Sequence, residues 1–137
     1  MKYLVMVLGS QADYAAMGGS ASAGSPAWSE EELQAMFAYM GEINKDLTAS
    51  GELVDGQGLV EPARTRFVNL GEDGQPVITD APYGETEEVL AGYWLLECAD
   101  LERVTEIAAR VARCPVPDGS PDHPVVIRPV DSGPDAG

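Results

Sequence analysis

Positive charge is scarce in this sequence. Its 137 residues carry 8 Lys and Arg against 23 Asp and Glu, which gives a formal net charge of −15. The basic residues are scattered along the chain rather than gathered in one segment. Because nucleic acids and anionic membranes are bound through basic side chains that neutralise phosphates, the composition argues against both as partners. The acidity itself is typical of a soluble protein.

Cysteine, histidine and long apolar runs are also scarce. The chain has 2 Cys, which form no Cys-x-x-Cys pair, and a single His, so neither a disulfide nor a transition-metal site is indicated. No stretch approaches the roughly 20 apolar residues of a membrane-spanning helix, and the apolar run at residues 3–8 is too short for a signal peptide. Phosphate-binding and nucleophile-elbow motifs are missing. We therefore expect a cytoplasmic protein without metal or cofactor.

The residues that are present suit one domain with a hydrophobic core, since 45% of the chain is hydrophobic. Strands are predicted at 3–8, 52–60, 63–70, 75–79, 92–98 and 125–128. One helix is predicted from the Ser29 cap to Gly51, and a second begins at Asp100 and stops before Pro115. The Gly/Ser/Ala-rich segment 9–28 is expected to be a long loop and 131–137 a disordered tail, which leaves 1–130 as the domain.

This order of elements predicts an α+β fold of the ferredoxin-like type, βαββαβ, with an antiparallel sheet and two helices on one face. The strands at 3–8 and 92–98 are apolar on both faces. Because the second face of such a sheet needs a cover, we expect a homodimer that packs sheet against sheet, in a dimeric α/β barrel-type sandwich.

The segment from Asp80 to Glu88, Asp-Ala-Pro-Tyr-Gly-Glu-Thr-Glu-Glu, is followed by Gly92-Tyr93 and an apolar strand. It resembles the signature of the YCII-related proteins of the DGPF type, Asp-Gly-Pro-Phe-Ala-Glu-Thr-Lys-Glu, and the resemblance extends over about residues 1–130. Ala81 stands where that signature has Gly, Tyr83 replaces Phe, and Glu87 replaces Lys. We call Asp80–Glu88 the signature turn.

The resemblance implies a ferredoxin-like dimer with a cleft near the signature turn. Some relatives in the wider superfamily are similar to small-molecule enzymes, and some DGPF-type domains accompany sigma factors. The expected function is thus binding of a small organic molecule, with metal-free proton transfer as the chemistry of a lyase or isomerase. The alternative is a non-catalytic regulatory module associated with a sigma factor or another transcription component. Whether the chain is an enzyme stays open at this point.

Asp80 and Glu85 are the candidate acid/base pair, because two carboxylates can exchange a proton with a substrate. Each also has a structural interpretation: Asp80 as an Asx-turn residue, and Glu85 as a backbone cap or a solvated charge. Tyr83 either donates a hydrogen bond to a ligand or only packs in the turn. The candidate ligand-binding residues are Tyr83, Pro82, Arg64, Arg66, Trp28 and Tyr93.

Arg64 and Arg66 share the parity of one predicted strand, where they either hold a ligand carboxylate or serve as charges at a sheet edge. His123 lies in Pro121-Asp122-His123-Pro124. A lone His in a loop between prolines is expected to be solvated, and its role is left open.

Overall fold

The computed structural model describes residues 1–22 and 24–131. Its main body is an antiparallel sheet of four strands in the order β2-β5-β1-β6, with β1 at Lys2–Gly9 and β2 at Leu53–Gly58. The other two strands are β5, Val89–Glu97, and β6, Val125–Pro129. The order matches the ferredoxin-like arrangement, so the fold class expected from the sequence is confirmed.

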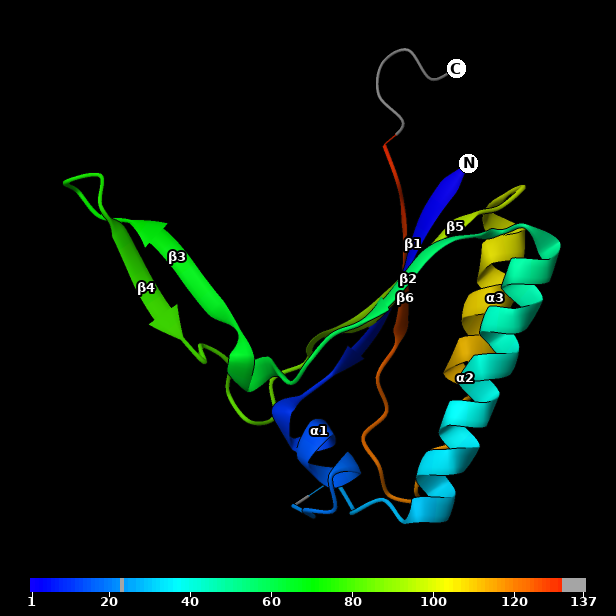
Figure 1. Cartoon of the computed structure of the whole chain (residues 1–137), viewed down its shortest axis with the longest axis horizontal. Coiled ribbons are helices and arrows are strands. Elements are labelled where there is room, and N and C mark those ends of the chain that lie inside the picture. Colours follow the sequence, from blue (N-terminus) through cyan, green and yellow to red (C-terminus); the bar gives the residue numbers. More distant parts are fainter. Residues whose placement is uncertain (23, 132–137) are drawn as a thin grey trace.

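Two helices cover one face of this sheet (Figure 1). Helix α2, Glu30–Ser50, begins at the Ser29 capping box with Glu32 and ends at Gly51, whose φ of 79° suits glycine. Helix α3, Leu101–Ala112, begins at Asp100, whose side chain accepts a hydrogen bond from the Arg103 N–H. Both predicted helices are therefore confirmed together with the residues that cap them.

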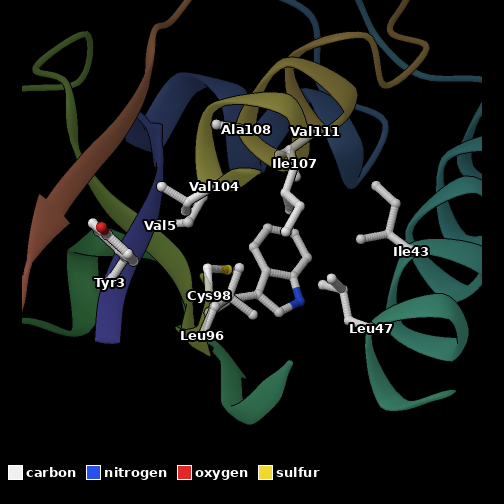
Figure 2. Close-up of a cluster of buried hydrophobic side chains, with 11 residues drawn as sticks. Tyr3, Val5, Ile43, Leu47, Leu96, Cys98, Val104, Ile107, Ala108 and Val111 are labelled. Atoms are coloured by element: carbon white, nitrogen blue, oxygen red, sulfur yellow. The ribbon is translucent and has the colours of Figure 1, made fainter. Parts of the chain in front are cut away.

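The core lies between the sheet and these helices (Figure 2). Tyr3 and Val5 of β1 pair with Leu96 and Trp94 of β5, and all four side chains face the helices. The Trp94 ring nitrogen donates to Asn44 Oδ1 of α2 at 2.6 Å. A Cβ on residue 56 would stand 3.2 Å from the Trp94 ring, so Gly56 gives the indole its room.

The opposite face of the sheet carries the alternate residues of the same strands. In β1 these include Leu4 and Met6, which pair with Leu95 and Tyr93 of β5. None of the four belongs to the buried core, and each is partly exposed. We call this surface the open face.

The expectation that 9–28 is one long loop is wrong. Residues Gln11–Met17 form helix α1 directly after β1. Ser10 and Asp13 make a reciprocal capping box, and the small side chains of Ala12 and Ala16 are buried. Alanine gives a weak hydrophobic pattern, which explains why the periodicity of the sequence does not reveal this helix.

Strands β3, Arg66–Leu70, and β4, Pro76–Asp80, form the predicted hairpin as a separate two-stranded sheet. Figure 1 shows it projecting from the main body, and we call it the arm. All ten residues of the two strands are exposed. Strand β3 starts later than predicted because Pro62–Arg64 forms a 3-10 turn, η1, so Arg64 and Arg66 do not share a strand. The predicted tail lies outside the described residues, except for position 131.

Candidate functional site

The signature turn joins the arm to β5, and its first residue is part of the arm. Asp80 ends β4 and pairs across the hairpin with Arg66. Arg66 Nε donates to Asp80 Oδ1 at 2.7 Å and Nη2 donates to Oδ2 at 3.3 Å, in an exposed ion pair. The guanidinium lowers the pKa of the Asp80 carboxyl, which makes it a weaker base. The role of general base stays a prediction for Asp80, and this ion pair weighs against it.

A pocket of about 380 Å³ lies beside the turn. Its walls come from two segments, one between β2 and the arm and the other from the signature turn into β5. The lining residues are Leu59, Val60, Glu61, Pro62, Arg64, Thr65, Tyr83, Val89 and Leu90. A larger hollow of about 620 Å³ is lined by α3 residues and by Arg113 just beyond the helix. Because one helical segment forms that hollow, we take the pocket with two walls as the candidate binding site.

The structure brings two of the predicted ligand-binding residues, Arg64 and Tyr83, into this pocket. The Tyr83 ring packs edge-on against Phe67 of the arm, with ring centroids 5.4 Å apart and an interplanar angle of 88°. This contact fixes the ring, and the lining places Tyr83 at the pocket wall. The position of Tyr83 is therefore compatible with both interpretations made from the sequence, which are packing in the turn and contact with a ligand.

The other predicted residues are not among the pocket lining: Asp80, Pro82, Glu85, Arg66, Trp28 and Tyr93. The Glu85 carbonyl accepts a hydrogen bond from the Ala12 N–H at 2.9 Å. Trp28 donates its backbone N–H to the Ala16 carbonyl, and the Tyr93 hydroxyl donates to Asp55 Oδ2 at 3.4 Å. The cited contacts thus tie the Asp80 side chain to Arg66 and the Glu85 backbone to α1.

Helix α1 fixes both walls of the pocket. The Tyr14 hydroxyl donates to the Leu59 carbonyl at 2.9 Å, and Gln11 Oε1 accepts from the Ala63 N–H at 2.7 Å. The Ala12 N–H holds the other wall through Glu85. Helix α1, which the apolar pattern of the sequence does not predict, is therefore the element that positions the candidate site.

His123 is not the solvated loop residue that we expected. Its Nδ1 lies 2.6 Å from Glu88 Oε2 and its Nε2 lies 2.7 Å from Asp13 Oδ2. Only 20% of its side chain is exposed. We call these three side chains the histidine clasp, since they join α1, the signature turn and the segment before β6.

Each ring nitrogen of His123 faces a carboxylate, so the arrangement favours the doubly protonated imidazolium, which donates on both sides. Burial lowers the pKa of His123, but hydrogen bonds and charge interactions with Glu88 and Asp13 outweigh it and raise the pKa overall. An imidazolium with both N–H groups engaged has no free nitrogen to accept a proton. In this state His123 holds segments together rather than acting as a base.

Asp13 is the most connected member of the clasp. Its Oδ2 also accepts from the Ser10 N–H at 2.9 Å, and its Oδ1 accepts from Ser25 Oγ at 3.2 Å. Burial raises its pKa, but the hydrogen bonds from His123 and Ser10 lower it overall, so the carboxylate stays ionised at neutral pH. The one signal in the sequence was the Ser10-x-x-Asp13 spacing of a capping box.

The described part of the chain holds no group of three or more His, Cys, Asp or Glu arranged to hold a metal ion. Within the same residues, no helix is both long and apolar enough to cross a membrane.

The fold and the pocket define a small α+β protein of the ferredoxin-like class, with a pocket beside a turn that follows an inserted hairpin. The chain belongs to the YCII-related domain family, whose sequence model matches residues 1–118. It is also similar to an uncharacterised protein of Rhizobium meliloti (strain 1021), with 27% identity over 94 residues that cover 69% of this chain and 75% of that protein. The DGPF type stays a prediction from the signature turn.

Proposed function

We propose that this protein binds a small organic molecule in the pocket beside the signature turn. The observation that carries the proposal is the construction of the pocket: two segments, separated in the sequence by the arm, are each held by side-chain or backbone hydrogen bonds to α1. The lining combines apolar side chains with a few polar groups, as ligand pockets commonly do. A cytoplasmic location is part of the same proposal.

The test is ligand-dependent stabilisation measured against a panel of small organic molecules. A ligand at 100 times its Kd stabilises the folded state by about 2.7 kcal/mol, which raises the melting temperature. Leu59→Trp fills the pocket and should abolish the shift. Val116→Trp is the matched control, because Val116 is 54% exposed and does not line the pocket. A ligand that stabilises both variants equally binds elsewhere and contradicts the proposal.

Metal-free proton transfer, in an elimination, isomerisation or cyclisation, is the chemistry that we propose for a bound substrate. The sequence supports Asp80 and Glu85 in this role, whereas neither lines the pocket. Asp80→Asn and Glu85→Gln therefore give a separate test once a substrate is known. Loss of turnover with an unchanged melting temperature would support catalysis, and unchanged turnover in both variants would remove these residues from the mechanism.

We also propose that two copies of the chain associate through the open face. The support is the row of partly exposed apolar side chains on that face, which lie outside the core. The arm adds exposed Val68 and Leu70, at 60% and 75% exposure, and an isolated two-stranded hairpin has marginal stability in water. A second copy that covers both surfaces would bury apolar area from each chain.

Sedimentation analysis tests the dimer directly. The wild-type protein should show twice the mass of one chain, and Leu4→Lys should give monomers because it places a charge on the open face. Val116→Lys, which introduces the same charge elsewhere, should stay dimeric. A wild-type protein that sediments as a monomer at all concentrations would overturn the dimer proposal.

The second candidate function is a regulatory module that binds a sigma factor or another transcription component. The net charge of −15 favours a basic partner protein. Co-purification with such a partner that weakens as salt is added would support this function, because screening removes the attraction between exposed charges. Binding that is insensitive to salt would argue against it.

A further inference from the structure

Arg64 is the basic side chain in the lining of this pocket, and it has no carboxylate partner among the described residues. Arg66, Arg103 and Arg110 each form an ion pair with an acidic side chain. Arg64 lines the pocket but takes part in no ion pair or side-chain hydrogen bond within residues 1–22 and 24–131. In a chain with 23 acidic residues, a basic group at a pocket wall without such a partner is available to a ligand.

Two acidic side chains lie in this region, and neither forms an ion pair with Arg64. Asp80, at the end of the arm that borders the pocket, is held by the guanidinium of Arg66. Glu61 lines the pocket with Arg64, and its Oε2 accepts from Gln11 Nε2 at 3.4 Å. The two arginines therefore differ: the charge of Arg66 is neutralised within the arm, whereas Arg64 keeps its positive charge at a pocket wall that also carries the Glu61 carboxylate.

Two hydroxyl groups accompany this charge. Thr65 and Tyr83 line the pocket, and neither hydroxyl has a hydrogen-bond partner in the described part of the chain. The Tyr83 ring is fixed by its edge-on contact with Phe67. Both hydroxyls can donate to an anionic oxygen, and a guanidinium pairs with a carboxylate in a bidentate way.

The rest of the lining selects the body of the ligand. Leu59, Val60, Pro62, Val89 and Leu90 are apolar, so they favour a hydrocarbon portion beside the anionic group. The Glu61 carboxylate at the same wall disfavours a second negative charge on the ligand.

We propose that the ligand class of this pocket is small organic monocarboxylic acids, with the carboxylate on Arg64 and the apolar body against Leu59, Val89 and Leu90. This inference rests on the proposed function, since it requires that the pocket binds a ligand. It goes further by naming the chemical class and the residue that selects it.

The experiment compares benzoate with benzamide, which has a similar shape and no charge. Binding is followed by backbone amide chemical shifts of the wild-type protein near 0.15 M salt, where the screening length of about 8 Å limits repulsion from the acidic surface. We expect both probes to shift pocket residues and benzoate to bind at least about tenfold more tightly, as a charge-assisted hydrogen bond implies.

Arg64→Gln should lower benzoate affinity to the benzamide level and leave benzamide affinity unchanged. Arg113→Gln is the matched control, because it removes the same charge from a residue that does not line this pocket. If benzoate and benzamide bind the pocket equally, or if both variants weaken benzoate equally, the ligand class is wrong while the binding pocket stands. If neither probe shifts any pocket residue, the pocket proposal and the ligand class are both contradicted.

Discussion

Ala81 stands where the DGPF-type signature that this turn resembles has Gly, and the difference affects the backbone. Ala81 has a φ of 50°, and no other non-glycine residue in the described ranges has a positive φ. Its N–H donates to the Thr65 carbonyl at 2.9 Å, which ties the signature turn to the start of the arm. A side chain in the left-handed region costs about 1–2 kcal/mol, a cost that glycine avoids.

We predict that Ala81→Gly raises the free energy of unfolding by about 0.5 kcal/mol. The relief of backbone strain exceeds the extra entropy of glycine in the unfolded chain, which costs about 0.5–1 kcal/mol. Urea denaturation measures the change. Ala63→Gly is the control, since η1 places Ala63 at negative φ and glycine there should destabilise. Equal destabilisation by both substitutions would show that position 81 carries no strain.

At the same scale, the sequence shows why His123 was misjudged. Its partners are 35 and 110 residues away along the chain, at Glu88 and Asp13. No short-range spacing records such contacts, and the flanking prolines are typical of an exposed loop. Tyr83 was predicted as a ligand contact because it lies in the signature turn, and Arg64 because a guanidinium can pair with a ligand carboxylate. The strand that Arg64 was expected to share with Arg66 is wrong, since Arg64 lies in η1.

At the scale of elements, prediction succeeded where capping and apolar spacing agree. Helix α2 has the Ser29 capping box, an apolar stripe and Gly51, and its bounds followed from these. Helix α1 has the cap at Ser10 but buries only two alanines, so its apolar signal is weak. Because α1 fixes both pocket walls, the assembly of the site could not be predicted without it.

Glu52 and Arg103 join two elements, the end of α2 and the start of α3. Arg103 Nε and Nη2 donate to Glu52 at 2.9 and 2.8 Å. The hydrogen bonds from Arg103 outweigh burial and lower the pKa of Glu52 to about 2. This contact therefore stabilises the protein above the unfolded pKa of the carboxyl, near 4.5, and the stabilisation is lost as pH falls toward 2.

We predict that Glu52→Gln lowers the free energy of unfolding by about 1 kcal/mol at pH 7, allowing for solvent screening of a partly exposed pair. The difference from wild type should shrink as the pH falls below 4.5. Urea denaturation at a series of pH values measures it. Glu97→Gln is the control, because Glu97 pairs with the N-terminal amine and not with Arg103. It should not reproduce the pH-dependent loss of stability of Glu52→Gln. A deficit that stays constant down to pH 2 would refute the linkage.

At the scale of the whole molecule, the order of strands and helices was enough to predict the sheet and the covered face. The separation of the arm from that sheet was not predictable from the sequence. The pairing of β3 with β4 is local, and it is the same whether or not the hairpin also pairs with the main sheet. The position of the arm matters for function, since Phe67 holds Tyr83 at the pocket. The dimer expected from the two apolar sheet faces stays a prediction.

The histidine clasp connects segments from across the chain, so its protonation should affect the stability of the whole fold. The pKa of His123 is raised, so its contribution is fully present below the unfolded value near 6.5 and is lost as pH rises through the folded pKa. Asp13 stays ionised in this range because its pKa is lowered. The two cysteines do not titrate in the same pH range as His123. Burial raises the pKa of Cys98 to about 11 and also raises the pKa of Cys114, so both thiols stay protonated at neutral pH.

We predict that Glu88→Gln removes part of the pH dependence of stability. The glutamine oxygen can still accept a hydrogen bond from the imidazolium of His123, but the negative charge that stabilises the imidazolium is gone. At pH 6 the variant should be about 1 kcal/mol less stable than wild type, the scale of a partly screened ion pair, and the difference should narrow above the folded pKa of His123. Glu87→Gln is the matched control, since Glu87 accepts from the Gly84 N–H and does not contact His123. A Glu88→Gln deficit that is unchanged from pH 6 to pH 9, or that Glu87→Gln reproduces, would mean that His123 is not held as a cation. A narrowing confined to Glu88→Gln, together with an imidazole titration above 6.5 by NMR, would establish that His123 is held as a cation between Glu88 and Asp13 and that its protonation stabilises the fold.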